Sequence, residues 1–417
     1  GYAVGYYWNI MWLDAVALLP LIILGLNKLI LEDKFLLYVI ALAVALISNF
    51  YIGFFICVFI VLYYLTLYFS NFNGLHLEHF IKKTLQVAFY SFLAVSAAAV
   101  VLIPTFRGLQ LTQAVNSNFP SEFKTYFDVL ELFNNLLAGV TPSVKSGLPN
   151  IFSGFITLYM LAVFYLSENV SIKKKAASIL LILIYMLSFN TNTLNYMMHG
   201  FKFPNEVPYR FAFVFSFMLI TWGYEGFQNF EGLSTKKIAH ISFGFLAYLL
   251  VNESLKLSDT VFFVSLGALT LYSVLFLAYR HGGIRKKAFA IGLGILILSE
   301  VLLSAILGTN TTGSSGRNSY PTLGTEVKAA VSTIYEEDPE AYRIEQIKWY
   351  STNDPTLYGF RGVSMFSSTV NANISKFTQK LGLAASPESN RYLFATSTPL
   401  VNGMLGVKYL ICRDHTG

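Results

Sequence analysis

Charged residues are scarce in this sequence: Lys, Arg, Asp and Glu make up 12% of its 417 residues, against about 25% in an average soluble domain. Cysteine is scarcer still. Cys57 lies in an apolar run and Cys412 in the more polar tail, so no disulfide framework is expected. The chain also lacks a Walker A loop and the HExxH, CxxC, GxSxG and DxD motifs. These absences give no support to a disulfide-stabilised secreted domain or to a soluble nucleotide-sugar enzyme.

Apolar residues dominate instead, since 55% of the chain is hydrophobic and its mean hydropathy is +0.55. The charges divide the chain into two parts. Residues 1–307 carry 19 Lys+Arg and 14 Asp+Glu in short clusters between apolar runs, whereas residues 308–417 carry 10 and 9 within an ordinary globular composition. We therefore predict an α-helical polytopic membrane domain over 1–307, followed by a mixed α/β domain over 308–417.

A helix needs about 20 apolar residues to cross a membrane, with a range of about 17–25. Allowing for shorter runs, the sequence offers about ten candidate transmembrane helices. They cover residues 12–31, 35–48, 52–69, 84–104, 150–167, 176–190, 208–226, 238–251, 260–279 and 288–307.

Basic residues assign the loops between these spans to two sides. One set of loops carries thirteen Lys and Arg residues, at positions 28, 34, 82, 83, 173–175, 236, 237, 280 and 285–287. The alternate set carries six, at positions 107, 124, 145, 202, 210 and 256. Because basic loops stay in the cytoplasm, the loops 105–149 and 191–207 and the domain 308–417 are expected outside. This placement of positive charge at helix ends is typical of membrane proteins and does not indicate nucleic-acid binding.

Three spans that run outward, 35–48, 176–190 and 238–251, are shorter than a full crossing. Each ends at polar residues. A helix that ends below the membrane surface exposes carbonyl groups that must face protein or water. We therefore expect a recess that opens on the outer side; boundaries misplaced by one turn are the structural alternative.

The loop HGFKFPNEVPYRFAF, residues 199–213, carries more polar chemistry than a turn needs. Pro204 and Pro208 should stiffen it. Arg210 falls in the first turn of the span 208–226, where the helix dipole disfavours a cation unless an anion is bound. The alternative is an arginine that reaches lipid headgroups. The expected substrate-binding residues of this loop are His199, Lys202, Asn205 and Arg210.

Further candidates lie at the outer ends of other spans. Asp14 follows Trp12 and is either a helix cap or a site carboxylate, for which we predict a catalytic role. Asn49 and Tyr51 of SNFYIG can bind sugar hydroxyls, although a structural role at the chain reversal is favoured. Arg107 of TFRGL joins them as a substrate-binding candidate. No metal site is predicted.

Two other features have open interpretations. Glu300 lies well inside the last span, where an acid is either functional or a packing hydrogen bond. The segment FDVLELFNNLL has helical spacing of its apolar residues, which predicts a helix on the membrane interface or a cap over the bundle. The tail predicts a helix near 325–336, a strand near 341–347, a helix near 370–382 and a strand near 406–412.

Several strings resemble the bacterial YfhO family of polytopic membrane proteins. They are NIMWLDAVALLPLIILGL, ALISNFYIGFFIC, HGFKFPNEVPYRFAF, SEVLLSAILGT and NDPTLYGFRGVSMFSSTVN. The family resembles GT-C-type glycosyltransferases, which take a sugar from a polyprenyl-phosphate donor on the outer side of the membrane. In such enzymes the principal acid lies in the first outer loop, so the resemblance implies that it lies upstream of Gly1.

The resemblance implies a glycosyltransferase of the bacterial plasma membrane with its C-terminal domain outside. The expected partners are a lipid-linked sugar donor, membrane lipids and a cell-envelope polymer acceptor such as lipoteichoic acid, with Lys202 and Arg210 holding the donor phosphate. No cofactor is expected, and a divalent-metal requirement stays open. A transporter or lipid flippase is the alternative, which predicts internal symmetry and midplane polar residues that the sequence does not display. A membrane anchor for the tail would not need a charged outer loop. We expect both ends of the chain to be truncated.

Overall fold

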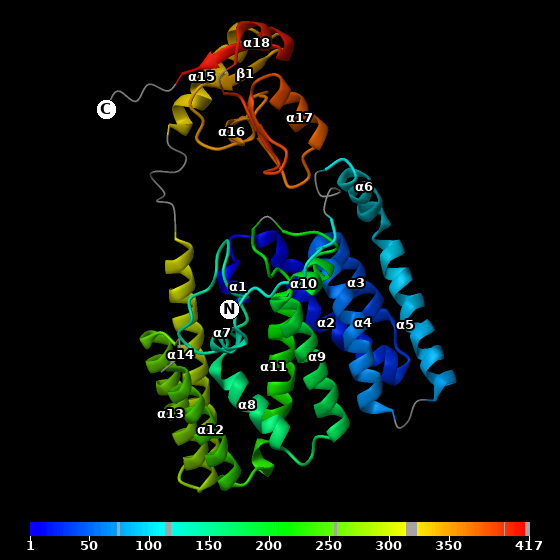
Figure 1. Ribbon diagram of the computed structural model, residues 1–417, viewed down its shortest axis with the longest axis vertical. Helices are drawn as coiled ribbons and strands as arrows, with labels where there is room; N and C mark the ends of the chain where they lie inside the picture. Colours follow the sequence, from blue (N-terminus) through cyan, green and yellow to red (C-terminus); the bar gives the residue numbers. More distant parts are fainter. Residues whose placement is uncertain are drawn as a thin grey trace. The chain divides into compact units, whose positions relative to one another are not determined.

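The computed structural model describes residues 1–72, 76–112, 118–204, 206–253, 257–313, 323–395 and 397–412. The chain divides into two compact units (Figure 1). The first contains Gly1–Leu102 and Asn118–Gly313, and the second contains Ile103–Ser117 and Ser314–Gly417. Helix α14 (Lys286–Thr312) lies wholly in the first unit, and the segment Ile103–Ser117 clusters with the C-terminal residues.

Each of the ten apolar runs forms helical structure. The corresponding helices are α2 (Ile10–Glu32), α3 (Leu36–Ser48), α4 (Phe50–Asn71), α5 (Leu77–Ala97) with α6 (Ala99–Leu109), α8 (Phe155–Leu166), α9 (Ile172–Asn190), α11 (Ala212–Gln228), α12 (Thr235–Glu253), α13 (Asp259–Arg280) and α14 (Lys286–Thr312). The short helix α1 (Tyr2–Gly5) precedes them, and α7 (Val129–Asn134), α10 (Asn192–Met198) and the 3-10 turn η2 (Phe230–Gly232) lie between them.

Among the described residues, four helices are long and apolar enough to cross a membrane: α2, α4, α13 and α14. A fifth is counted if the bent pair α5 and α6 forms one span. The other apolar helices are shorter or more polar, α3 having 13 residues and α8 only 12. The structure therefore supports a membrane protein with several spans, and it meets the expected ten only in part.

The predicted span 84–104 is not straight. Its helix breaks at Ala98, and α5 and α6 meet at 78°. Of the three short outward spans, only α3 keeps its expected length. Helices α9 and α12 each have 19 residues, because they begin further toward the basic end than the apolar runs indicated.

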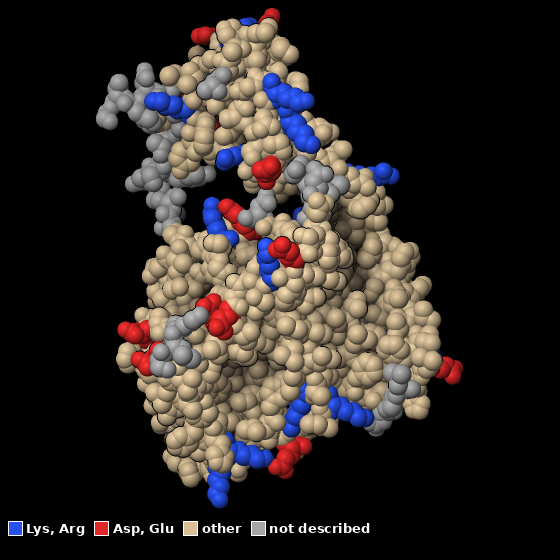
Figure 2. Space-filling model, viewed as in Figure 1, with Lys and Arg blue, Asp and Glu red and all other residues tan. Residues whose placement is uncertain are grey.

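Within the first unit, the described loops of the two sets lie at opposite ends (Figure 1). We call these the basic end and, after the predicted orientation, the outer end. At the basic end, ion pairs join Lys83 to Asp33 at 2.8 Å and Lys174 to Glu225 at 2.7 Å. At the other end, Asn49 donates to the Met11 backbone oxygen over 3.0 Å. Figure 2 shows Lys and Arg groups along the lower edge of this unit, with a wide uncharged surface above them. An uncharged surface of this kind can lie in the membrane, with the charged groups at the membrane surface.

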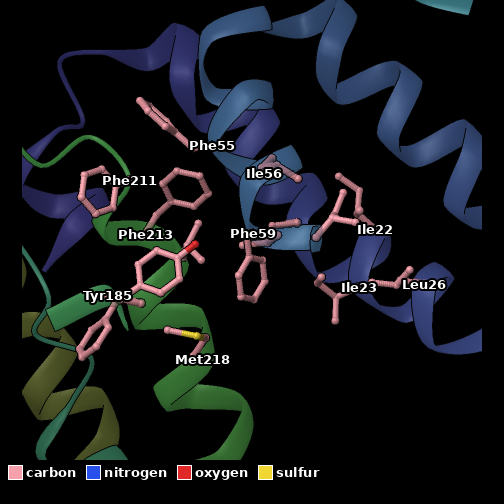
Figure 3. Packing of buried hydrophobic residues seen from close by; sticks show 14 of the residues in the cluster. Ile22, Ile23, Leu26, Phe55, Ile56, Phe59, Tyr185, Phe211, Phe213 and Met218 are labelled. Carbon is pink, nitrogen blue, oxygen red and sulfur yellow. The ribbon is translucent and has the colours of Figure 1, made fainter. Parts of the chain in front are cut away.

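Aromatic residues fill the core of the first unit. Phe189 stacks on Phe211 with ring centroids 5.0 Å apart, and Phe59 meets the Tyr185 ring edge-on at 6.2 Å. Figure 3 shows Phe59 with Ile22 and Ile23 on one side and Met218 and Tyr185 on the other. A second buried cluster connects α8 with α12, α13 and α14. The two clusters together hold the helices that support the outer loops.

Two small sheets and flanking helices form the second unit. Besides the end of α6, its elements are α15 (Gly324–Glu337), β1 (Arg343–Gln346), α16 (Asp354–Tyr358), β2 (Met365–Phe366), α17 (Ala372–Lys380), β3 (Ala384–Ser386), β4 (Arg391–Leu393), α18 (Pro399–Leu405) and β5 (Val407–Ile411). Strand β1 pairs with β5 in parallel, and β4 pairs with both β2 and β3 in antiparallel fashion. All four elements predicted in the tail are confirmed.

The close packing of α8 against α11 can be tested through Gly226. A Cβ atom there would overlap the Met160 carbonyl oxygen of α8. We expect Gly226→Ala to cost about 1–3 kcal/mol of unfolding free energy, as overpacked sites do. Gly244 of α12 has open space around it, so Gly244→Ala should be neutral or slightly stabilising. Thermal unfolding in detergent measures both; equal midpoints for the two variants would contradict this packing.

The orientation can be tested with single cysteines in a background that carries both Cys57→Ser and Cys412→Ser. Lys328→Cys in α15 and Asn118→Cys in the outer loop should react with a membrane-impermeant thiol reagent in intact cells. Lys287→Cys at the basic end should react only after the membrane is permeabilised, because basic loops stay in the cytoplasm. All three positions are exposed in the structure. If only Lys287→Cys were labelled in intact cells, the orientation would be the reverse of the predicted one.

Candidate functional site

Asparagine side chains fasten the outer loops to the helix ends. The Asn190 side-chain oxygen accepts hydrogen bonds from the backbone N–H groups of Tyr126 and Phe127, each 3.1 Å long. Asn192 accepts from the Lys124 backbone at 3.0 Å and donates to the Glu122 carbonyl at 2.7 Å. The polar end of the predicted span 176–190 therefore binds the outer loop, which satisfies backbone groups that lipid cannot.

The loop of residues 199–213, which we call the opening loop, is held in a strained conformation. Phe201 and Val207 have φ angles of 60° and 57°, in the left-handed region. That region is a genuine outlier for a β-branched residue such as Val207. The Val207 N–H donates to the Lys145 carbonyl over 2.8 Å, and its own carbonyl accepts from Arg210 over 3.2 Å. Strain of this kind persists where surrounding contacts fix it, and it concentrates at functional sites.

Arg210 lies between two aromatic rings. Its guanidinium carbon is 5.2 Å from the Tyr51 ring centroid and 5.5 Å from that of Trp12, so both make cation–π contacts. The guanidinium also donates to the Glu206 carbonyl over 2.8 Å. Helix α11 begins at Ala212, so Arg210 precedes it in a turn and does not lie in its first turn as the sequence predicted.

Lys202 brings a second cation to the same ring. Its Nζ atom is 5.4 Å from the Tyr51 centroid. Burial lowers the pKa of Lys202 from its ordinary value, and the charge of Arg210 lowers it further. The one carboxylate of this loop, Glu206, pairs with Lys145 at 3.4 Å. Within the described ranges neither Lys202 nor Arg210 forms an ion pair, so two like charges share one ring without a carboxylate between them.

His199 is enclosed behind this pair, with only 1% of its surface exposed. Its ring packs edge-on against Phe55 and Phe211 at 5.7 and 5.2 Å. Nδ1 lies 2.8 Å from the Asn195 carbonyl. A carbonyl only accepts, so Nδ1 carries the proton and Nε2 is left as an acceptor. Nε2 is buried and has no partner among the described residues.

Burial lowers the pKa of His199 to about 4, and the bond to the Asn195 carbonyl opposes this shift only in part. The charges of Arg210 and Lys202 lower the pKa further. His199 is therefore neutral at pH 7. It can accept a hydrogen bond from a ligand, but it adds no positive charge to the pair.

A pocket of about 510 Å³ lies beside the opening loop, and we call it the outer pocket. The lining residues come from the loop 118–150, from α10 and from the opening loop. They are Tyr126, Phe127, Glu131, Gly147, Leu148, Asn195, Phe203, Pro204, Pro208 and Tyr209. Phe203 and Tyr209 are the sequence neighbours of the two cations. The loop thus contributes both to the pocket and to the cation pair.

The remaining predicted site residues have varied surroundings. Asp14 is exposed on α2, past its first turn, so it does not cap the helix. No hydrogen bond or ion pair joins it to another described residue. Asn49 caps α4 through the Ile52 N–H at 2.9 Å, which supports its structural interpretation. Arg107 lies in α6, in the part assigned to the second unit. Asn205 lies outside the described residues, and the proposed roles of these four residues stay predictions.

Glu300 has a structural function in the helix bundle. Its carboxylate accepts the Phe155 N–H and the Tyr272 hydroxyl, each over 2.8 Å. It thus provides from α14 the cap that α8 lacks at Gly154. The predicted interface helix is shorter than FDVLELFNNLL: α7 has six residues, with Asp128 as its N-cap and Leu132 buried.

Sequence reasoning missed the residues that line the outer pocket from the loop 118–150, above all Tyr126 and Glu131. It also missed Trp12 as an aromatic neighbour of Arg210. Asn190 and Asn192 indicated that a loop binds at this helix end, but only the fold shows that this loop is 118–150. Among the residues that the structure describes, no three His, Cys, Asp or Glu side chains gather as a metal site would require.

Comparisons with known proteins point to one family. The family described as "Bacterial membrane protein YfhO" matches residues 1–416. An uncharacterized protein, YfhO of Bacillus subtilis (strain 168), is 23% identical over 391 residues, which cover 89% of this chain and 42% of the relative. The chain thus spans less than half the length of that curated relative. No solved structure matches the chain.

The buried His199 should make stability depend on pH. Its pKa is about 4 in the folded chain and ordinarily 6.5, so the unfolded chain binds more protons between these values. Stability should therefore fall as the pH drops from 6.5 to 4, by on the order of 3 kcal/mol from this group. In His199→Phe the thermal midpoint should depend less on pH between 4 and 6.5 than in the unchanged protein. His240→Phe, at an exposed position, should keep the original pH dependence. An unchanged slope in His199→Phe would refute the neutral, buried state.

Proposed function

Since the chain belongs to the YfhO family of bacterial membrane proteins, we propose that it is part of a membrane glycosyltransferase. In this proposal the donor is a polyprenyl-phosphate sugar and transfer takes place on the outer face of the membrane. The acceptor is a cell-envelope polymer such as lipoteichoic acid. The resemblance to GT-C enzymes gives the reaction class, and the outer end of the first unit gives the residues.

The observation that carries the proposal is the pair of cations at Tyr51. Lys202 and Arg210 both lie within 5.4 Å of its ring centroid, and neither forms an ion pair in the described chain. Two partly buried like charges repel each other. An anion that binds both removes this repulsion, and a phosphate fits because the guanidinium fork can bind two of its oxygens while the ammonium binds a third.

The chemistry needs this charge. The acceptor hydroxyl oxygen forms a bond to the anomeric carbon of the sugar, and the bond from that carbon to the donor phosphate oxygen breaks. The electron pair leaves with the polyprenyl phosphate, and the hydroxyl proton passes to a carboxylate. Negative charge therefore grows on the departing phosphate, where Lys202 and Arg210 stabilise it.

The other groups have roles that follow from their positions. Tyr126 and Tyr209 in the outer pocket offer aromatic faces for a sugar ring, and Asn195 and Glu131 offer polar groups for its hydroxyls. Asp14, exposed on α2, is the proposed catalytic residue within this chain, and the carboxylate that takes the proton is the principal acid that the resemblance implies. The second unit is proposed to bind the acceptor polymer outside the cell.

Substitution of the two cations tests the phosphate site. A charged hydrogen bond typically contributes about 1.5–3 kcal/mol. Arg210→Ala should therefore lower catalytic efficiency by roughly one to two decades. Arg210→Lys should recover only part, because the charge returns without the fork. The measurement is sugar transfer from a polyprenyl-phosphate donor in membranes that contain the full-length protein at matched expression.

Lys202→Ala is the more specific variant, because Lys202 makes a cation–π contact with Tyr51 but no hydrogen bond among the described residues, whereas Arg210 also donates to the loop backbone. The catalytic efficiency of Lys202→Ala should fall, whereas its thermal stability should stay unchanged. Lys124→Ala removes an outer cation from an exposed ion pair with Glu122 and should change neither. Near-normal transfer by Lys202→Ala and Arg210→Ala would refute the phosphate site. Binding of polyprenyl phosphate without any sugar transfer would favour the flippase alternative.

A further inference from the structure

Helix α6 is apolar and almost uncovered by the rest of the described chain. It has no buried residue. The side chains of Val100, Ile103 and Phe106 are 75%, 62% and 63% exposed. Because residues three apart are neighbours on a helix surface, these three form one apolar face. An exposed face of this kind marks contact with a membrane or with another protein.

The junction with α5 gives α6 its direction. The two helices together are long and apolar enough for one span, yet they meet at 78° where the helix breaks at Ala98. With α5 as the crossing helix, a helix that leaves it at this angle runs along the membrane surface. The far end of the segment is also held, because the Leu111 carbonyl accepts the Ala372 N–H of α17 over 2.9 Å. Helix α6 therefore does not continue the span, and it has the orientation of an interfacial helix.

Arg107 adds a cation to this face. It follows Phe106, lies one turn after Ile103 and is exposed. Within the described residues it has no hydrogen bond or ion pair. The sequence has no Asp or Glu between Glu78 and Glu122, so no carboxylate near it in the chain competes for the guanidinium. An arginine beside an apolar face can keep its stem on that face while its fork binds phosphate oxygens.

We propose that α6 lies on the outer surface of the membrane and binds anionic phospholipid. Val100, Ile103 and Phe106 enter the acyl-chain region, and Arg107 binds the lipid phosphate. Another protein helix is the alternative cover for an apolar face. The bend at Ala98 and a cation without a carboxylate favour lipid, because phosphate groups lie at the membrane surface along which α6 runs. The site is distinct from the cation pair at Tyr51, and it requires no sugar transfer.

Spin labels test whether α6 lies in the lipid. The full-length protein, freed of its other cysteines, receives a nitroxide at Val100→Cys or Ile103→Cys in nanodiscs of phosphatidylglycerol and phosphatidylcholine. Oxygen dissolves among the acyl chains, whereas a nickel chelate stays in water. Both labels should relax faster with oxygen, and Asn118→Cys, at an exposed position of the outer loop, should relax faster with the chelate. Labels on α6 that behave like Asn118→Cys, or that neither agent reaches because protein covers α6, would overturn the proposal.

A fluorophore at Gln110→Cys, one turn after Arg107, tests the lipid charge. The nanodiscs contain phosphatidylglycerol and phosphatidylcholine in equal amounts, and one of the two carries a nitroxide quencher. Phosphatidylglycerol should be enriched about fivefold around the fluorophore, the effect of one basic residue near an anionic surface. Arg107→Gln should remove this enrichment, and Lys124→Gln, at an outer lysine that pairs with Glu122, should keep it.

Both replaced side chains are exposed, so the fold should not depend on them. Equal quenching by the two lipids in the protein that keeps Arg107 would refute the preference for anionic lipid. Enrichment that persists in Arg107→Gln would refute the phosphate contact of this residue.

Discussion

The outer end of the first unit depends on backbone groups that find their partners in asparagine side chains. Apolar helices that end near the membrane surface leave carbonyl and N–H groups that lipid cannot satisfy. A carboxamide offers a donor and an acceptor together, so a single residue can join a helix end to a loop. Asn190 and Asn192 do this for the loop 118–150, and Asn150 binds both the N–H and the carbonyl of Ser143 within it, each at 2.8 Å.

These hydrogen bonds explain how the loop 199–213 can hold a strained residue and two neighbouring cations. Val207 stays in the left-handed region because the Lys145 carbonyl and Arg210 hold it on both sides. The same contacts bring Arg210 to the ring that Lys202 also approaches. A loop with free movement would separate two like charges. A fixed loop keeps them together, so the phosphate of the proposed donor would meet a preorganised site, and binding would lose less free energy to ordering.

Hydrophobic runs alone were enough to predict where helices form, and α15, β1, α17 and β5 were also readable in the tail. The bend after Ala97 was not, because neither proline nor glycine marks it: Pro104 lies further on, inside α6. Strands β2, β3 and β4 have two or three residues each, too few for a pattern. The outer pocket was unpredictable for another reason. Its walls come from segments some 70 residues apart, such as Tyr126 and Asn195, and only the folded chain brings them together.

Glu300 and the cation pair show how buried charge can be assigned a role. An acid inside a membrane helix suggests function by default. Glu300 instead accepts hydrogen bonds that hold helices of the bundle together. Helix α8 begins within the bundle, where the N–H groups of its first turn have no partner inside the helix. Glu300 accepts one of these N–H groups with one oxygen, and its other oxygen accepts the Tyr272 hydroxyl. Lys202 has a ring contact but no hydrogen bond among the described residues. Each oxygen of Glu300 already accepts a hydrogen bond from the fold, whereas the partly buried Lys202 beside Arg210 has a ring contact only, so an anion or water can complete its bonding. That difference, rather than burial alone, directs the search for substrate to the outer end.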